Sequence, residues 1–203
     1  MSKLSGLLYD SLLEPLLNNW KSKIASLILK KPMGVTLDIC CGTGKQCRII
    51  AQNSAAIGVD LNFEILQFAH SRAPHIPFVC ADAQYLPFKP RSFQHIVISL
   101  ALHDKPEHLR QKMIREAKQT LRTNARLLLL DFEKPSTRKS KIGYSFINLI
   151  EFMAGTEHFR NGREFVKSGG LKSFLLRNNL KIERIHASSW GSSSIIETVT
   201  YDS

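Results

Sequence analysis

The sequence predicts an α/β fold in which helices cover both faces of a mostly parallel, doubly wound sheet of seven strands. Three observations predict it. Short apolar segments alternate with amphipathic ones from residue 35 to residue 132. The apolar segments are hydrophobic throughout rather than at every second position, which is typical of parallel strands buried on both faces. The connections between segments are short, and several contain glycine or proline.

Each predicted element follows from the local pattern of residues. Leucine and isoleucine recur at helical spacing over residues 4–31 until Pro32 and Gly34 end the pattern. Further helices are expected at 44–53, 62–72, 106–121 and 169–179, and strands at 35–40, 55–60, 77–81, 93–99, 126–132, 181–187 and 194–201. The short turn at Trp190 and Gly191 predicts that the last two strands are antiparallel.

The length of 203 residues fits one domain, for which four consecutive segments are expected. They are an N-terminal helical cap (1–31), a cofactor-binding core (32–133), an inserted substrate cap (134–168) and a C-terminal helix with a strand pair (169–203). The segment 134–168 is interpreted as a cap because it shows no strand pattern and combines an apolar stretch with a polar, glycine-containing one.

The composition excludes several classes of protein. With 43% hydrophobic and 22% charged residues, the chain is not disordered as a whole. No window approaches the roughly 20 apolar residues of a membrane span, and no signal peptide is recognisable, so a cytoplasmic protein is expected. The four cysteines form no CxxC pair and include the neighbours Cys40 and Cys41, which predicts reduced thiols and no metal site.

The net charge of +11 favours contact with an anionic partner, although lysines that simply face solvent would give the same excess. Between Lys134 and Arg184 there are eleven basic and four acidic residues, and an apolar stretch (142–154) lies among them. This combination is consistent with peripheral contact with an anionic membrane surface, and equally with a lid over a small-molecule pocket.

Polar and small residues follow four predicted strands at the edge where parallel sheets bind ligands. The first is the glycine-rich turn in Asp38-Ile-Cys-Cys-Gly-Thr-Gly44, which lets a ligand approach the backbone closely. Asp60 ends the second strand, where a carboxylate can accept two hydrogen bonds from a ribose diol or cap the next helix. Asp82 follows the third strand, with the same alternative of a cap, and Ser99 ends the fourth.

As a set, these motifs resemble the class I S-adenosylmethionine-dependent methyltransferases, and within them the group similar to the ubiquinone/menaquinone C-methyltransferases. The motifs are Asp-x-Cys-Cys-Gly-Thr-Gly, Gly-Val-Asp, Ala-Asp-Ala-x-x-Leu-Pro-Phe and Phe-x-x-Ile-Val-x-Ser, and they lie within residues 7–134. The resemblance implies a Rossmann-like methyltransferase fold and S-adenosylmethionine as the cofactor. It is a poor guide to the methyl acceptor.

The resemblance also implies roles for individual residues. Asp38 and the turn from Gly42 to Gly44 would approach the methionine part of the cofactor, Asp60 would hold the ribose, and Asp82 and Ala83 would flank the adenine. Ser99 would line the pocket, and Tyr9 would belong to a helix that closes over the cofactor, or else pack between helices. The complete set of expected cofactor-binding residues is Tyr9, Asp38, Cys40, Gly42, Thr43, Gly44, Asp60, Leu61, Asp82, Ala83 and Ser99.

Methyl transfer needs a general base only if the acceptor must first lose a proton. His103, which follows the fourth strand, is the first candidate, with a helix-capping loop histidine as the alternative. His158, in the cap, is the second candidate.

A small-molecule or lipid-like acceptor is expected. A nucleic acid, such as RNA, is less favoured because Ser99-Leu-Ala-Leu102 stands where base-methylating enzymes carry an Asn-Pro-Pro-Tyr-like motif. The basic residues are also not interleaved with an aromatic platform. A cofactor-binding module without catalytic activity is the third hypothesis.

Overall fold

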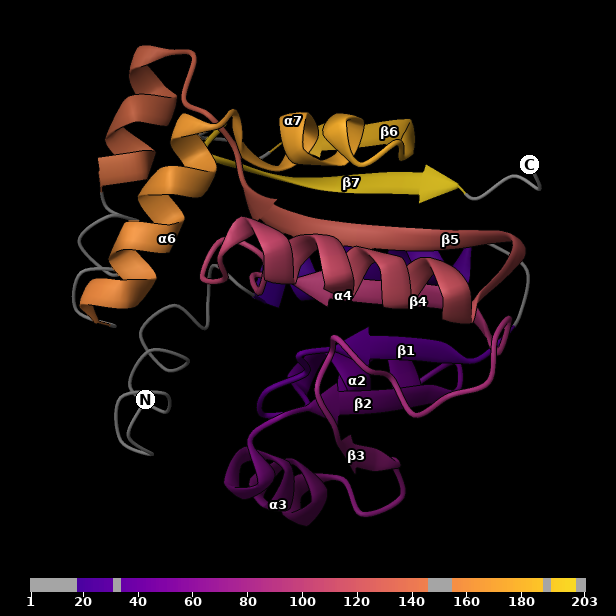
Figure 1. The fold of residues 1–203 in the computed structure, drawn as a ribbon. Helices are drawn as coiled ribbons and strands as arrows, with labels where there is room; N and C mark the ends of the chain where they lie inside the picture. Colours follow the sequence, from indigo (N-terminus) through magenta and orange to yellow (C-terminus); the bar gives the residue numbers. More distant parts are fainter. Residues whose placement is uncertain (1–17, 31–33, 146–154, 188–190, 200–203) are drawn as a thin grey trace.

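A computed structural model describes residues 18–30, 34–145, 155–187 and 191–199. It contains a seven-stranded sheet in the order β3-β2-β1-β4-β5-β7-β6 (Figure 1). The strands are β1 (Thr36–Ile39), β2 (Ala56–Asp60), β3 (Phe78–Cys80), β4 (Phe93–Ser99), β5 (Leu121–Phe132), β6 (Lys181–Ala187) and β7 (Ser193–Val199). The predicted fold class is therefore confirmed.

Helices join and cover the strands. They are α2 (Lys45–Ala51), α3 (Phe63–Arg72), α4 (Glu107–Thr120), α6 (Thr156–Lys167) and α7 (Gly170–Arg177), and residues 18–29 and 138–145 are also helical. The first part of the predicted N-terminal helix, including Tyr9, lies outside the described residues.

The four consecutive leucines of β5 show why the strands are apolar throughout. Successive side chains of a strand point to opposite faces of the sheet. Leu127 and Leu129 accordingly belong to the core cluster that contains Met113 of α4, whereas Leu128 and Leu130 belong to the cluster on the other face. The first core packs beneath α4 and α7, and the second beneath α2, α3 and the helix of residues 18–29 (Figure 1).

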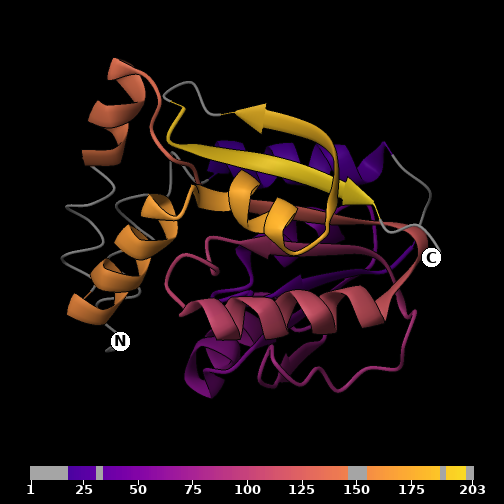
Figure 2. The same cartoon turned by 45° about the horizontal axis from the view of Figure 1, so that its top comes forward.

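Strands β1 to β5 are parallel, so their carboxyl ends meet at one edge of the sheet. Helix α6 and the helix of residues 138–145 lie beyond this edge in both orientations (Figures 1 and 2). Residues from the segment predicted as a cap therefore stand over the place where a doubly wound sheet binds its ligands.

Two details of the sheet can be compared with the expectation. Strand β7 pairs antiparallel with both β5 and β6, as predicted. Strand β5 begins at Leu121 rather than at residue 126, because α4 runs into it without a loop. Asn124 accommodates this junction with a φ of 57°, a left-handed conformation that asparagine tolerates.

Candidate functional site

The glycine-rich turn between β1 and α2 uses left-handed backbone conformations that few side chains tolerate. Cys40, Gly42 and Gly44 have φ angles of 59°, 53° and 69°. A Cβ atom at Gly44 would lie 2.7 Å from the ring of Phe78, so this glycine lets the turn pack against β3. A Cβ atom at Gly42 would meet none of the described residues within 4 Å, so these residues leave open space beside the backbone at Gly42.

Asp60 connects the end of β2 to this turn. Its Oδ2 accepts a hydrogen bond from the main-chain N of Gly42 at 2.9 Å, and its Oδ1 accepts one from the N of Asn62 at 2.9 Å. The cap of α3 is instead Asn62, whose side chain accepts a hydrogen bond from the N of Ile65 at 3.1 Å. The N-cap of α3 is therefore Asn62 and not Asp60. Two hydrogen bonds hold Asp60 beside the space that the described residues leave at Gly42.

Asp38 lies beneath the turn with 2% of its surface exposed. Burial raises the pKa of its carboxyl group to about 7, although the thiol of Cys47, which donates to Oδ2 at 3.4 Å, and the charge of Lys21 act in the opposite direction. The carboxyl group of Asp38 therefore packs under the turn inside the protein and is not exposed to a ligand.

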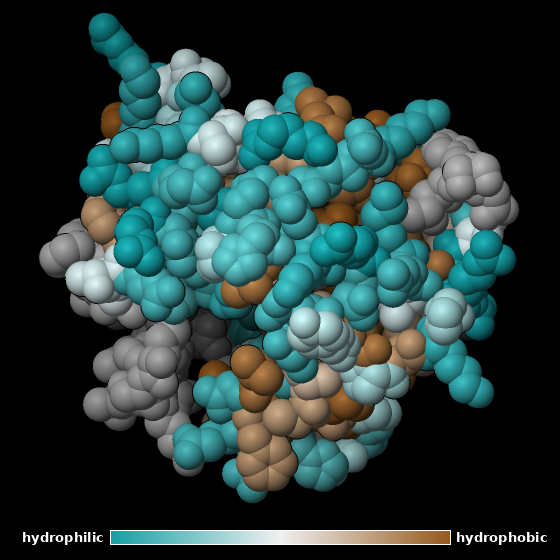
Figure 3. Space-filling model, viewed as in Figure 1, coloured by the Kyte–Doolittle hydropathy of each residue, from teal (hydrophilic) through white to brown (hydrophobic). Residues whose placement is uncertain are grey.

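The end of β3 forms a turn of its own. Asp82 Oδ1 accepts a hydrogen bond from the main-chain N of Gln84 at 2.8 Å, and Ala83 beside it is buried. Two large apolar side chains near the ends of β2 and β3 are exposed, Leu61 (67%) and Tyr85 (68%). Figure 3 shows hydrophobic surface over this lower part of the molecule, next to a hollow beneath α6.

Two further residues predicted for the site, Ser99 and Thr43, lie at the same edge. The hydroxyl oxygen of Ser99, at the end of β4, is buried and has no hydrogen-bond partner among the described residues. Such an atom is costly unless a partner binds to it. Thr43 is half-buried in the glycine turn.

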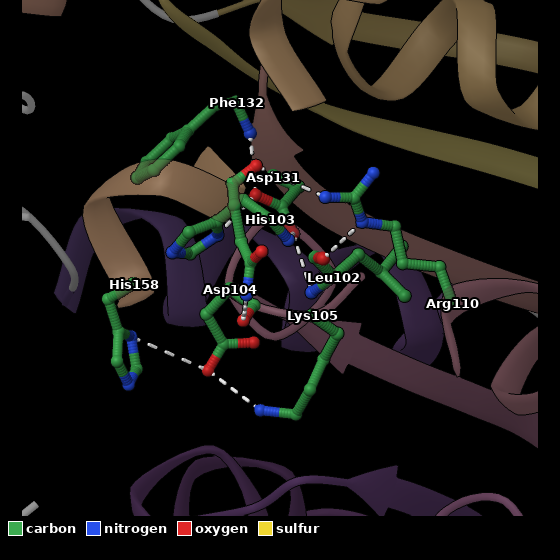
Figure 4. A network of polar contacts seen from close by, with 9 residues as sticks. Leu102, His103, Asp104, Lys105, Arg110, Asp131, Phe132 and His158 are labelled. Atoms are coloured by element: carbon green, nitrogen blue, oxygen red, sulfur yellow. Dashed lines mark hydrogen bonds and ion pairs between the residues drawn. The ribbon is translucent and has the colours of Figure 1, made fainter. Parts of the chain in front are cut away.

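His103 forms a tight buried pair with Asp131 at the end of β5 (Figure 4). The distance from Nδ1 to Oδ1 is 2.6 Å, and the imidazole packs on the ring of Phe132 with 4.1 Å between centroids. The other carboxylate oxygen of Asp131 accepts hydrogen bonds from the main-chain N of Leu102 (3.0 Å) and of His103 (3.2 Å). Only 3% of His103 is exposed, so the pair fixes the loop after β4 from within.

His158 belongs to a second pair of histidine and aspartate. Its Nδ1 lies 3.7 Å from Oδ2 of Asp104, and the ammonium group of Lys105 lies 2.8 Å from the same oxygen. These three side chains gather between α6 and the loop after β4 (Figure 4). The structure therefore brings both predicted histidines to the same edge, each beside a carboxylate.

Arg110 fastens α6 to this loop, although none of its surface is exposed. Its Nε donates to the main-chain O of Leu102 at 2.8 Å, and its Nη2 donates to the main-chain O of Asn161 at 3.1 Å. Nη2 also lies 2.9 Å from Oε2 of Glu164. The side chain of Asn161 in turn donates to the main-chain O of Asp104 at 2.8 Å.

The polar residues of this site that were not among the candidates named from the sequence include Asp104, Arg110 and Asp131. Asp131 ends the fifth strand, so the rule that drew attention to Ser99 applies to it as well. Arg110 precedes Met113 and Ile114 by three and four residues, which places it on their buried face. Asp104 offered no such signal beyond its position next to His103.

Known proteins share sequence with the part of the chain that carries this geometry. Residues 36–170 match the model of a methyltransferase domain family. The chain is 30% identical over 132 residues to a demethylmenaquinone methyltransferase of Thermotoga maritima, covering 63% of this chain and 56% of the relative. It is 34% identical over 129 residues to a 2-phytyl-1,4-naphtoquinone methyltransferase of Thermosynechococcus vestitus, covering 58% and 55%. The chain thus spans about half the length of these relatives.

This chain belongs to the class I S-adenosylmethionine-dependent methyltransferase family.

Its fold is shared with solved structures of much lower identity. The YcgJ protein of Bacillus subtilis superposes with a TM-score of 0.69 at 17% identity, covering 92% of this chain and all of that protein. At this identity the likeness shows the fold alone.

The residues at the carboxyl edge fit the cofactor of this family, S-adenosylmethionine. Within the part of the chain that the structure describes, the space beside Gly42 leaves room for a ligand against the backbone. On the neighbouring strand, the hydroxyl of Ser99 finds no partner among the same residues. Asp60 keeps further lone pairs on both oxygens for hydroxyl groups.

Two further features concern the described residues alone. None of their helices is both long and apolar enough to cross a membrane. Among them, no three histidine, cysteine, aspartate or glutamate side chains are grouped so that they could hold a metal ion.

Proposed function

We propose that this methyltransferase transfers the methyl group of S-adenosylmethionine to a lipid-like acceptor with a hydroxyaromatic head group of the quinol type. The observation that carries the proposal is the Asp60–Gly42 hydrogen bond beside open space, at the edge where the strands of a doubly wound sheet end. The acceptor class is supported by the relatives, whose names refer to demethylmenaquinone and 2-phytyl-1,4-naphthoquinone.

The proposed cofactor contacts follow the order of the strands. Asp60 binds the ribose hydroxyls, Ser99 donates to or accepts from the methionyl part, and the turn around Gly42 lies against it. Asp82 and Ala83 are assigned to the adenine edge, where the exposed Leu61 adds apolar surface.

When bound, S-adenosylmethionine supplies a methyl group that is bonded to a positively charged sulfur. The positive charge makes this sulfur an activated leaving group. The work of the protein is to orient the acceptor in line, to exclude water and to take up a proton where the acceptor must ionise. A histidine on the acceptor side of the edge takes up this proton. The candidates are His103 and His158, each of which lies beside a carboxylate.

A direct test incubates the purified protein with isotope-labelled S-adenosylmethionine and a reduced short-chain 2-prenyl-1,4-naphthoquinone. The proposal expects labelled methyl in the quinol, and it expects none in total RNA supplied in its place. Label in RNA but not in the quinol would favour the nucleic-acid alternative. Binding of S-adenosylhomocysteine without transfer to a panel of quinols and phenols would favour a module without catalytic activity.

The outer face of α6 favours contact with an anionic lipid surface. A groove there is lined by Arg160, Arg163 and Lys167, together with Phe159 and the carboxylate of Glu164. A charge-driven contact weakens with salt. Flotation with vesicles that contain phosphatidylglycerol should therefore recover the protein at low salt, and R160E/R163E should reduce recovery. Equal recovery with neutral phosphatidylcholine vesicles would contradict this part of the proposal.

A further inference from the structure

Asp104, Lys105 and His158 form a polar cluster that the cofactor contacts do not use. Oδ2 of Asp104 lies 2.8 Å from the ammonium group of Lys105 and 3.7 Å from Nδ1 of His158. The three side chains converge from two elements, the loop after β4 and helix α6 (Figure 4). A carboxylate beside one nitrogen of an imidazole orients the ring and stabilises its protonated form.

The two elements that supply this cluster are fixed to one another. Asn161 follows His158 by three residues on α6, and its side chain donates to the main-chain O of Asp104 at 2.8 Å. The buried guanidinium of Arg110 donates to the main-chain O of Asn161 and of Leu102. The position of His158 over the loop is therefore set by hydrogen bonds, as a catalytic group requires.

The cluster faces the cofactor side of the edge. Burial lowers the pKa of Lys105, but the charge of Asp104, its hydrogen bond with Lys105 and the charges of Cys40 and Asp60 together outweigh burial, so the pKa lies above the ordinary value. Cys40 follows β1 and Asp60 ends β2, so the charge of Lys105 lies within electrostatic reach of the strand ends proposed for the ribose and sulfonium.

The side chains of the two histidines differ in their exposure to solvent. The side chain of His103 is 4% exposed, whereas that of His158 is 30% exposed. Asp131 also binds two main-chain N–H groups of the loop, which suits a structural role for the pair that it forms with His103. Oδ2 of Asp104 accepts a hydrogen bond from Lys105 and lies within ion-pair distance of His158.

We infer that His158 takes the proton of an acceptor hydroxyl, that Asp104 positions its imidazole, and that Lys105 faces the resulting oxyanion. The acceptor class is a phenol, hydroquinone or enol. This inference rests on the proposed function, because it assigns roles on the acceptor side of the same edge.

The imidazole of His158 accepts the hydroxyl proton, and the electron pair of the broken O–H bond stays on the acceptor, beside Lys105. The acceptor then forms a bond to the methyl carbon through that oxygen or through a conjugated ring carbon, and the bond from carbon to sulfur breaks with its electrons on sulfur. If carbon is methylated, the proton on that ring carbon passes to solvent water, its bonding electrons restore the aromatic ring, and the proton held by His158 returns to the oxygen.

One test does not need turnover. A nitrophenol with a visible phenolate absorption band is titrated into the protein loaded with S-adenosylhomocysteine. Wild-type protein should bind it mainly as phenolate at a pH at which the free compound is mostly protonated. His158→Ala and Lys105→Met should shift the bound compound toward the phenol, whereas the exposed His75→Ala and Lys118→Met should not.

A second test uses turnover of the reduced short-chain naphthoquinone. His158→Ala should lower kcat by roughly 100-fold or more, in the range for a lost general base, with little change in affinity for S-adenosylhomocysteine. Asp104→Asn should lower kcat by on the order of 10-fold and leave KM nearly unchanged, and Asp104→Glu should recover part of that loss.

The outcomes separate the two proposals. Absence of methyl transfer to any quinol or phenol contradicts the proposed function, whatever the spectroscopic result. If the wild type turns over but His158→Ala and Lys105→Met leave both the phenolate band and kcat unchanged, the inference is overturned while the proposed function stands. A nitrophenol that does not bind near the cofactor also overturns it.

Discussion

Nη2 of Arg110 and the main-chain O of Asn161, 3.1 Å apart, join α4 to α6 across 51 positions of the chain. The same guanidinium binds the main-chain O of Leu102 and lies 4.7 Å from the ring centre of Phe165. One fully buried cation thus unites the sheet-covering helix, the loop after β4 and the helix over the carboxyl edge.

Replacing this cation should destabilise the fold. Arg110→Met leaves the main-chain oxygens of Leu102 and Asn161 without their donor, and breaking a buried charged network of this kind costs about 3 kcal/mol or more. Urea denaturation should show the loss in the free energy of unfolding. Lys118→Met, on the exposed face of the same helix, should change it by no more than about 0.5 kcal/mol. Equal effects of the two substitutions would contradict the role given to Arg110.

The two glycines of the turn should respond differently to alanine. In Gly44→Ala the new Cβ meets the ring of Phe78 and the Cβ of Ala69, at a φ of 69°, so the melting temperature should fall markedly. In Gly42→Ala the Cβ enters open space, and the folding cost is only the left-handed conformation, about 1 kcal/mol. The Cβ atom added in Gly42→Ala would also occupy space in which the cofactor is proposed to bind.

The measurement for this pair combines melting temperatures with calorimetric titration of S-adenosylhomocysteine. Gly42→Ala should lose affinity by at least 10-fold while it stays folded. Wild-type affinity in that variant would mean that the cofactor does not lie against Gly42.

Asp38 predicts a dependence of stability on pH. Its carboxyl pKa is raised from 3.8 to about 7, first of all by burial, so the folded chain keeps a proton that the unfolded chain releases above about pH 4. The contribution of this group to stability is therefore complete below that pH, decreases as the pH rises, and is lost above about pH 7. The whole difference amounts to about 4 kcal/mol at most.

Asp38→Asn removes this titration. The variant should gain stability over wild type as the pH rises from 5 to 8, by melting temperature at constant ionic strength. If the two curves run parallel over that interval, the buried carboxyl does not titrate as proposed.

Much of the fold was predictable from the sequence because apolar residues dominate β2, β4 and β5 and are present on both of their faces. In β5, Leu127–Leu130 require cover on each side, which is the property of a doubly wound sheet. The start of β5 was misplaced because residues 121–125 are mixed in character, and their pairing depends on a register shift opposite Phe93 and His95.

The strand ends proposed to bind the cofactor could be named from the sequence, because each of them follows an apolar segment. The acceptor side was not, because Arg110 and Asn161 meet only when α6 folds over the edge. A buried arginine also resembles a solvent-facing one in sequence unless its spacing to Met113 is noticed.

Titration of S-adenosylhomocysteine into wild-type protein and into Asp60→Ala tests the account most directly. The control is Asn62→Ala, which removes the cap of α3 and should cost about 1 kcal/mol of stability with little loss of affinity. The account predicts binding to the wild type and to Asn62→Ala, and no measurable binding to Asp60→Ala with an unchanged circular dichroism spectrum. Undiminished affinity of Asp60→Ala, or no binding to the wild type, would contradict the claim that the ends of β1, β2 and β4 enclose the cofactor.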